Sequence, residues 1–277
     1  MSGNDQRTAD AFATSWNNLP SGSVYTEEQV ADWFAPLSAA DIRGRRVLEM
    51  GCGNGSLMVH VVRWSPERLD GIDLGASVDS ARANLVASGA RNWSVQQADL
   101  VAFASGGYDV VYSIGVLHHL KEPKAGFDAV VRNTRPGGRF HCWVYAREGN
   151  GIVIALVEPI RRVASRLPWW LTKYGLATPL VFPYFLYAKT LSALPRWGWL
   201  RALPLHDYSL WIARREFAFF RHVAFDQLVT PQTTYLDRKT LEGWLAAIPN
   251  IAPGSSYVTM RNGNSWKFGA TLMGDAR

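Results

Sequence analysis

The chain has 277 residues, 48% of them hydrophobic, and a formal net charge of +6. This length supports one sizeable core, or a core with a subdomain. The two cysteines, Cys52 and Cys142, are too few for a disulfide framework or a cysteine-based zinc site. The polar N-terminus, MSGNDQRTAD, is unlike a signal peptide, so we expect a cytoplasmic protein.

The positive charge is concentrated in one segment. From Arg147 to His222 the chain holds 11 Lys/Arg against 4 Asp/Glu, whereas the remaining residues hold 18 against 19. The same 76 residues contain 14 of the 34 aromatic residues. We therefore expect three parts: N-terminal helices with a binding core over 1–146, a helical insertion over 147–230, and a C-terminal helix and strands over 231–277.

Short amphipathic helices are predicted at Asp10–Trp16 and Glu27–Phe34, because aromatic residues recur on one face of each. A first strand is predicted at Arg46–Met50. The sequence then reads MGCGNGSL, with glycines at alternate positions, and a helix is predicted at Ser56–Trp64. A strand, a glycine turn and a helix are typical of a nucleotide-binding crevice at the carboxyl end of a parallel strand.

The spacing in this turn is E-x-G-x-G-x-G rather than the G-x-G-x-x-G of dinucleotide sites. Glu49 lies two residues before Gly51, where its charge would repel a diphosphate and attract an ammonium or a sulfonium group. The alternative is a tight strand–helix turn that binds nothing.

Two further acids lie at or just after the ends of predicted strands. The strand Leu69–Leu74 contains Asp73, 22 residues after Gly51, where a carboxylate can accept both ribose hydroxyls. The alternative for Asp73 is a cap for the helix predicted at Ser77–Ser88. The third strand, Trp93–Gln97, is followed by Asp99, which is alternatively a polar turn residue.

The second half of the predicted sheet contains a near-continuous apolar strand at Tyr108–Val116, as expected for a central parallel strand. Its tip carries His118 and His119. A helix at Lys124–Arg135, ended by Pro-Gly-Gly, and a strand at Arg139–Tyr145 follow. This alternation implies a doubly wound parallel sheet.

The C-terminal part predicts a helix at Thr240–Ala247 and two strands, Ser255–Arg261 and Ser265–Met273. An Asn-Gly-Asn turn at 262–264 predicts that these two strands form a hairpin.

These motifs together resemble the class I S-adenosylmethionine (SAM) methyltransferases, over roughly Val47–Tyr145 and the C-terminal strands. The resemblance is carried by Glu49–Gly55, Asp73, Asp99, the YDVVYSIGVLHHL stretch and the RPGGRF turn. It is similar to the small-molecule branch that includes quinone and sterol methyltransferases. It implies an α/β, Rossmann-like, doubly wound seven-stranded sheet with an antiparallel edge strand, plus the helical insertion. The implied SAM-binding residues are Glu49, Gly51, Cys52, Gly53, Asn54, Gly55, Asp73, Leu74, Asp99, Leu100, Ser113 and Gly115.

The resemblance also implies a methyl acceptor that is a small, apolar or amphipathic molecule, with oxygen or nitrogen favoured and carbon left open. His119 and, less favoured, His118 are candidate bases, because imidazole titrates in a useful range; the alternative is a scaffold role. Candidate acceptor contacts are Trp16, Tyr25, Tyr208, Trp211 and Asp226, for which burial or internal hydrogen bonding is the alternative.

The insertion predicts short helices broken at prolines. Its longest charge-free run, Tyr174–Ala188, has 15 residues, fewer than the ~20 that span a membrane. A cap over the cleft is favoured; a lipid-contacting surface and a nucleic-acid surface remain alternatives.

Other chemistries lack their motifs. No N/D-P-P-Y/F follows the fourth strand, no Pro-Cys nucleophile is present, and no metal-ligand spacing occurs. The alternatives that remain are an RNA methyltransferase and a non-catalytic SAM-binding protein.

Overall fold

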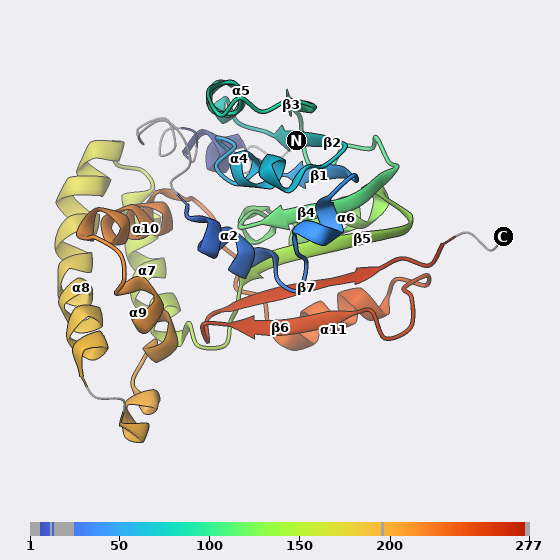
Figure 1. The fold of residues 1–277 in the computed structure, drawn as a ribbon. Coiled ribbons are helices and arrows are strands. Elements are labelled where there is room, and N and C mark those ends of the chain that lie inside the picture. The colour runs from blue at the N-terminus through green and yellow to red at the C-terminus, as the bar shows by residue number, and fades with distance from the viewer. Residues whose placement is uncertain (1–5, 12, 14–24, 195–196, 275–277) are drawn as a thin grey trace.

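The computed structural model describes residues 6–11, 13, 25–194 and 197–274. Its centre is a seven-stranded sheet with the strand order β3-β2-β1-β4-β5-β7-β6 (Figure 1). The strands are β1 Arg46–Met50, β2 Arg68–Asp73, β3 Trp93–Gln97, β4 Tyr108–Ile114, β5 Thr134–Tyr145, β6 Tyr257–Arg261 and β7 Ser265–Thr271. β1 to β5 pair in parallel, and β7 runs antiparallel to both β5 and the edge strand β6. The predicted doubly wound sheet with an antiparallel strand at its edge is confirmed.

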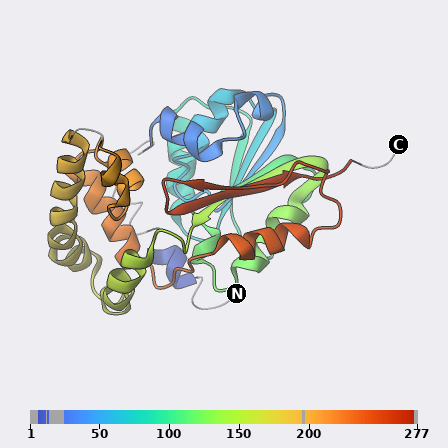
Figure 2. The ribbon, with the colours of Figure 1, turned by 90° about the horizontal axis from the view of Figure 1, so that it is seen from below.

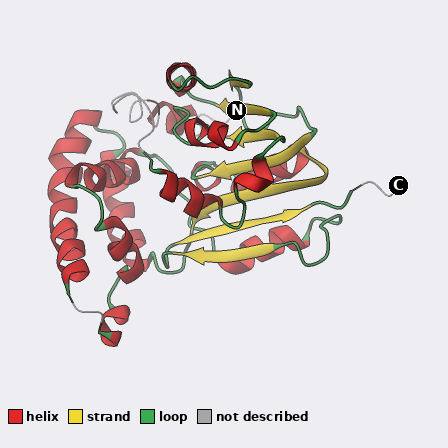
Figure 3. Ribbon diagram, in the orientation of Figure 1, coloured by secondary structure: helices red, strands yellow, loops and turns green. Residues whose placement is uncertain are grey.

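Helices cover both faces of this sheet (Figure 3). One face packs against α2 Glu27–Phe34, α3 Ala39–Ile42, α4 Met58–Val61, η1 Val62–Trp64 and α5 Ser77–Ala87. The other face packs against η2 Leu117–His119, α6 Pro123–Asn133 and α11 Arg238–Ala246. Successive side chains of a strand point to opposite faces, so Val47 joins the first core and Leu48 the second. Strands buried on both faces explain the near-continuous apolar runs in β1 and β4.

Several predicted boundaries move by a few residues. The helix after the glycine turn begins at Met58 rather than Ser56. The helix before β5 ends at Asn133, and the Pro-Gly-Gly segment lies inside β5 rather than in a turn. The strand tolerates this segment because its pairing with β4 is irregular there, between Tyr108 and Val110. The N-terminal helix covers residues 6–11 and 13, so it starts earlier than Asp10.

The insertion forms a separate group of helices beyond the carboxyl ends of the parallel strands (Figures 1 and 2). It consists of α7 Gly151–Ala164, the π-helix η3 Leu171–Ala177, α8 Thr178–Ala193, η4 Gly198–Ala202, α9 His206–Ile212 and α10 Phe217–Val229. The predicted helical character is confirmed, whereas the exact division into three parts stays a prediction. Within the described residues, none of the helices is both long and apolar enough to cross a membrane.

The expectation that prolines break these helices is wrong for the two longest. Pro159 lies inside α7 and Pro183 inside α8, yet each helix continues through its proline. A proline removes one helical hydrogen bond. Packing offsets that loss, because Val181 and Ala188 of α8 are buried against Ile212 and Phe220 of the neighbouring helices.

Candidate active site

The glycine turn after β1 is a tightly built loop. The amides of Gly51 and Cys52 both donate to the carbonyl of Ile72 on the neighbouring strand, at 2.8 and 2.9 Å. Gly51 has φ +88°, and a Cβ there would lie 2.4 Å from a methyl carbon of Val116. Only glycine fits this position, because both its backbone conformation and the space around it exclude a side chain. A ligand can therefore approach this backbone closely.

Asp73, at the carboxyl end of β2, reaches into this turn. One carboxylate oxygen accepts from the amide of Gly53 at 2.8 Å, and the other accepts from the amide of Gly75 at 2.8 Å and the hydroxyl of Ser77 at 3.4 Å. The side chain thus joins the glycine turn to the start of α5 and also lines the cavity described below. Burial raises the pKa of Asp73, and the bonds from Gly75 and Gly53 oppose that rise.

Glu49 is the most deeply buried acid of the site. Its side chain is 1% exposed and accepts a hydrogen bond of 2.8 Å from the hydroxyl of Tyr112. Burial raises the pKa of Glu49 from its ordinary 4.5 to about 8, and the nearby charge of Asp73 adds to this rise. A buried carboxylate of this kind is stabilised by a cation.

The third acid lies at the end of β3. Asp99 accepts from the amide of Val101 at 2.9 Å, which forms a local turn and presents the acid beside Leu100. Both residues line the cavity, as does Leu74 at the tip of β2. Three carboxylates, from Glu49, Asp73 and Asp99, thus surround one half of the cavity.

The cavity itself has a volume of about 490 Å³, which suits a small-molecule site. It begins at the carboxyl ends of the parallel strands and extends into the insertion. The predicted residues that line it are Tyr25, Glu49, Gly51, Cys52, Gly53, Asn54, Asp73, Leu74, Asp99, Leu100, Gly115, His119, Tyr208, Trp211 and Asp226.

Four residues that the sequence analysis assigned to the site are not found on the described cavity wall. Gly55 packs against the backbone of Ala81, and the buried hydroxyl of Ser113 donates to the carbonyl of Met50 at 2.8 Å. Gly55, Ser113 and His118 are absent from the described cavity wall. Trp16 lies outside the described residues.

The two histidines after β4 differ in surroundings. His118 is fully buried and packs against His119 and Tyr145, with ring centroids 4.1 Å away in both cases. Burial lowers the pKa of His118 well below its usual range, so its ring is neutral. The geometry favours the scaffold alternative for this residue.

His119 lines the cavity, and burial lowers its pKa to about 3. Its Nδ1 lies 3.1 Å from the carbonyl oxygen of Gln232. A neutral ring in this contact carries its proton on Nδ1 and donates it to the carbonyl, which leaves Nε2 as an acceptor.

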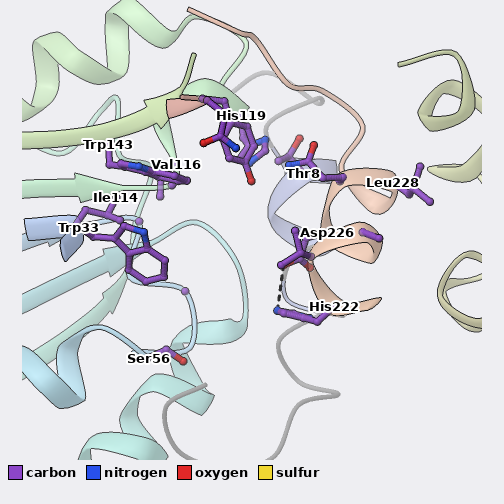
Figure 4. Close-up of a pocket in the computed structure, with 18 of the residues that line it drawn as sticks. Thr8, Trp33, Ser56, Ile114, Val116, His119, Trp143, His222, Asp226 and Leu228 are labelled. Atoms are coloured by element: carbon purple, nitrogen blue, oxygen red, sulfur yellow. Dashed lines mark ion pairs between the residues drawn. The ribbon is translucent and has the colours of Figure 1, made fainter. Parts of the chain in front are cut away.

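The opposite wall of the cavity is formed by α10. Figure 4 shows Asp226 and His222 of this helix across the cavity from Ile114, Val116 and Trp143 at the ends of the strands. The His222 Nε2 lies 3.2 Å from a carboxylate oxygen of Asp226, and both side chains are largely buried. An acid and an imidazole that contact one another inside an apolar cavity form a pair able to accept a proton.

Sequence reasoning missed several aromatic residues of the wall. Trp143 and Tyr145 come from the carboxyl end of β5, and Trp33 from the end of α2. A signal for the first two was available, because the carboxyl ends of neighbouring parallel strands meet at the same edge. Nothing in the sequence marked Trp33, whose place depends on how α2 packs on the sheet.

Arg261, on the edge strand β6, connects the insertion to the core. Its guanidinium is paired with Asp32, with Nε 2.6 Å from the carboxylate, and lies between the rings of Trp211 and Trp33, at 4.9 and 5.7 Å from their centroids. Because Trp211 belongs to α9, this cation–π contact holds the insertion against the core. Among the described residues, no group of three or more His, Cys, Asp or Glu is placed to hold a metal ion.

Comparison with known proteins agrees with this geometry. The profile of the methyltransferase domain family matches residues 24–200. The ubiquinone biosynthesis O-methyltransferase of Erwinia tasmaniensis is 32% identical over 143 residues, which cover 49% of this chain and 57% of that protein. Its namesake in Cronobacter sakazakii is 30% identical over 122 residues, covering 43% of this chain and 50% of that protein. The chain thus spans about half the length of these curated relatives.

Solved structures share the fold. The magnesium protoporphyrin IX methyltransferase of Synechocystis PCC 6803 with bound SAM superposes with a TM-score of 0.53 at 14% identity, covering 98% of each chain. An O-methyltransferase family protein from Burkholderia thailandensis gives 0.54 at 14% identity, covering 90% of this chain and 57% of that one. At such identities the likeness concerns the fold alone.

Proposed function

Because the chain belongs to the methyltransferase domain family and is a class I SAM-dependent methyltransferase, we propose that it methylates an oxygen or nitrogen atom of a small, apolar or amphipathic organic molecule. The observation that carries this proposal is the continuous cavity, acidic at the strand ends and apolar within the insertion. The names of the Erwinia and Cronobacter relatives describe O-methyltransferases, which supports oxygen as the acceptor atom.

The acidic half of the cavity would hold SAM. When bound, SAM supplies a methyl group activated by the positive charge of its sulfur. Glu49 would face the cationic amino acid part, Asp73 the ribose hydroxyls, and Asp99 with Leu100 the adenine. The electrostatic fit supports this assignment: three acids line the cavity, and Arg261, the one Lys or Arg among its described lining residues, is already paired with Asp32. Three acidic side chains favour a cationic nucleoside over one that carries phosphates.

The apolar half of the cavity would hold the acceptor. Its described wall comes from α7, α8, α9 and α10 and includes Val153, Val181, Tyr208 and Ile212. Binding there would keep water from the methyl group and orient the acceptor, which is the main contribution of a protein to this reaction. The polar groups are few, so they fix orientation rather than supply most of the affinity.

A proton must leave the acceptor when a hydroxyl or amine is methylated. The His222–Asp226 pair would receive it, because the two groups contact one another at 3.2 Å and line the cavity opposite the strand ends. His119 stays the second candidate: its neutral ring presents an acceptor nitrogen, but the pKa of about 3 makes it a weak base.

Isothermal titration calorimetry tests the cofactor half. We expect binding of SAM and of its demethylated product, S-adenosylhomocysteine, and neither NAD nor ATP should bind more tightly. Transfer of labelled methyl from SAM to a panel of phenols and amphipathic amines then tests the acceptor half. Binding of NAD or ATP without SAM would overturn the cofactor assignment, and methylation of RNA alone would overturn the acceptor class.

A further inference from the structure

The surface of the insertion is unusually apolar. Among the described residues, eleven of the thirteen large hydrophobic side chains that are exposed lie between positions 152 and 199. These eleven are Ile152, Leu156, Val163, Trp170, Tyr174, Leu180, Phe182, Leu186, Leu194, Trp197 and Trp199. An exposed apolar surface concentrated in one segment marks an interaction site rather than ordinary scatter.

On α7 the exposed residues follow helical spacing. Positions 152, 155, 156, 159, 162 and 163 are all exposed, and they recur at the i, i+3, i+4, i+7 spacing of one helix face; Arg166, just after the helix, is exposed as well. This outward stripe carries Ile152, Leu156 and Val163 together with Arg162 and Arg166. The buried side of the same helix carries Arg161, which pairs with Glu158 and donates to Gln227 at 2.6 and 2.9 Å. The helix therefore carries apolar side chains on its outward face as well as on its inward face, where Val157, Ile160 and Ala164 pack.

The charged residues of this segment are almost all positive. From Gly151 to Leu205 the sequence holds seven Lys/Arg and a single acid, Glu158, which is already paired with Arg161. Such a surface, with apolar side chains among cations, matches the chemistry of an anionic lipid bilayer. The apolar side chains can insert among the acyl chains, and the lipid phosphates attract the cations.

Lipid fits this surface better than a nucleic acid does. Single-stranded nucleic acids are held by aromatic rings on which the bases stack. On this surface six of the eleven exposed apolar side chains are aliphatic, among them all three on α7, and aliphatic side chains give bases nothing on which to stack. Trp197 and Trp199, at the start of η4, stack with ring centroids 6.0 Å apart and have the aromatic character found at membrane interfaces.

The apolar surface is continuous with the cavity. Ile152, Leu156 and Leu180 are 48%, 62% and 44% exposed, and all three also line the cavity wall. An apolar molecule dissolved in a bilayer would therefore meet the rim of the cavity without crossing water.

We propose that the exposed surface of α7, η3, α8 and η4 docks onto the face of an anionic lipid bilayer, so that the cavity opens at the lipid surface. Docking itself is independent of catalysis, whereas entry of the acceptor from the bilayer rests on the proposed function.

Co-sedimentation of the full chain with vesicles tests the docking. We expect binding to vesicles of phosphatidylglycerol and phosphatidylcholine, little binding to phosphatidylcholine alone, and weaker binding as salt rises. The variant V163S/W170S/W199S should weaken binding at least tenfold, as should R162E/R166E. The matched control V86S alters an equally apolar residue, 68% exposed on α5 and outside this surface, and should bind like the wild type.

Calorimetry with SAM on each variant shows whether the fold and the cofactor site are intact, so failure of docking is distinguishable from failure of the proposed function. Absence of wild-type binding to anionic vesicles would overturn the proposal. So would equal binding by all variants, or a dimer in sedimentation equilibrium that V163S/W170S/W199S dissociates, since a second copy would then cover the surface.

Discussion

Replacing Glu49 with glutamine is expected to stabilise the ligand-free protein and to weaken SAM binding at the same time. Glu49 is 1% exposed, and its partner is the Tyr112 hydroxyl, 2.8 Å away. Glutamine has nearly the same shape and still accepts that hydrogen bond, but it carries no charge that must be buried. The substitution therefore removes the cost of burying Glu49, which in the folded state must either keep a proton or carry a buried charge.

The size of this effect follows from the raised pKa. Burial moves the pKa of Glu49 from its ordinary 4.5 to about 8. The folded protein thus holds this proton more tightly than the unfolded chain, so stability falls as the pH rises from about 4.5 to about 8 and is constant, for this group, below and above that window. At pH 7 the loss is about 3 kcal/mol, because each pH unit above the unfolded value contributes about 1.4 kcal/mol.

Urea unfolding of ligand-free wild type and E49Q between pH 5 and 8.5 measures this loss. We expect the stability of E49Q relative to the wild type to rise by roughly 3–4 kcal/mol between pH 5 and pH 8, whereas any hydrogen bonding that the amide loses shifts the difference equally at every pH. The exposed Glu67 supplies a control, E67Q, that should change little at any pH. A stability difference between E49Q and wild type that does not vary with pH would refute the reasoning.

Binding supplies a second measurement on the same variant. A cation near Glu49 lowers its pKa, so SAM binding to the wild type at pH 7 should release up to about one proton. Calorimetry in two buffers of different ionisation enthalpy measures that proton. E49Q should release none and bind SAM at least tenfold more weakly; an unchanged proton count would show that Glu49 does not face the cation.

Three further predictions concern the rest of the site. D73N should weaken SAM binding by about 1–3 kcal/mol in calorimetry, the cost of an impaired charged hydrogen bond; unchanged affinity would count against the ribose assignment. G51A should lower the melting temperature and abolish SAM binding, because its Cβ would lie 2.4 Å from Val116, and G51A/V116A should recover part of the stability but not all of it, since φ stays at +88°. D226N should lower kcat about 10²-fold or more with the Kd for SAM unchanged, as expected for a residue that acts on the acceptor; an equal loss of SAM binding would place Asp226 with the cofactor instead.

The sheet was predictable from local pattern. Strands β1 and β4 are buried on both faces, so their sequences are apolar runs that hardly depend on distant parts of the chain. The hairpin of β6 and β7 was marked by its turn, where Asn262 and Gly263 adopt the positive φ that the residues Asn and Gly tolerate. Helix boundaries were less predictable. The Pro-Gly-Gly segment fits a turn or an irregular strand equally well, and only the pairing of Thr134 and Arg139, on either side of it, with β4 decides between them.

The cofactor half of the site was also easier to predict from the sequence than the acceptor half. Glu49, Asp73 and Asp99 lie at or just after the carboxyl ends of their strands, and these ends meet at one edge of a parallel sheet whatever the rest of the chain does. The acceptor half depends on how α10 packs across the cavity. His222 and Asp226 lie four residues apart on a helix, a spacing that brings them into contact but does not tell which way the pair faces.

The cost that Glu49 imposes on the ligand-free protein is best understood as the source of its selectivity. A neutral side chain at this position would leave the fold more stable at neutral pH, and the Tyr112 hydroxyl would still have a partner. Glu49 instead lies buried near Asp73, where a negative charge on either side chain raises the free energy of ionising the other. A cation relieves that repulsion and a phosphate increases it. We therefore expect that the ligand that restores the most stability to this crevice is a positively charged nucleoside, and that the same electrostatic arrangement rejects dinucleotides that the sheet topology alone would accept.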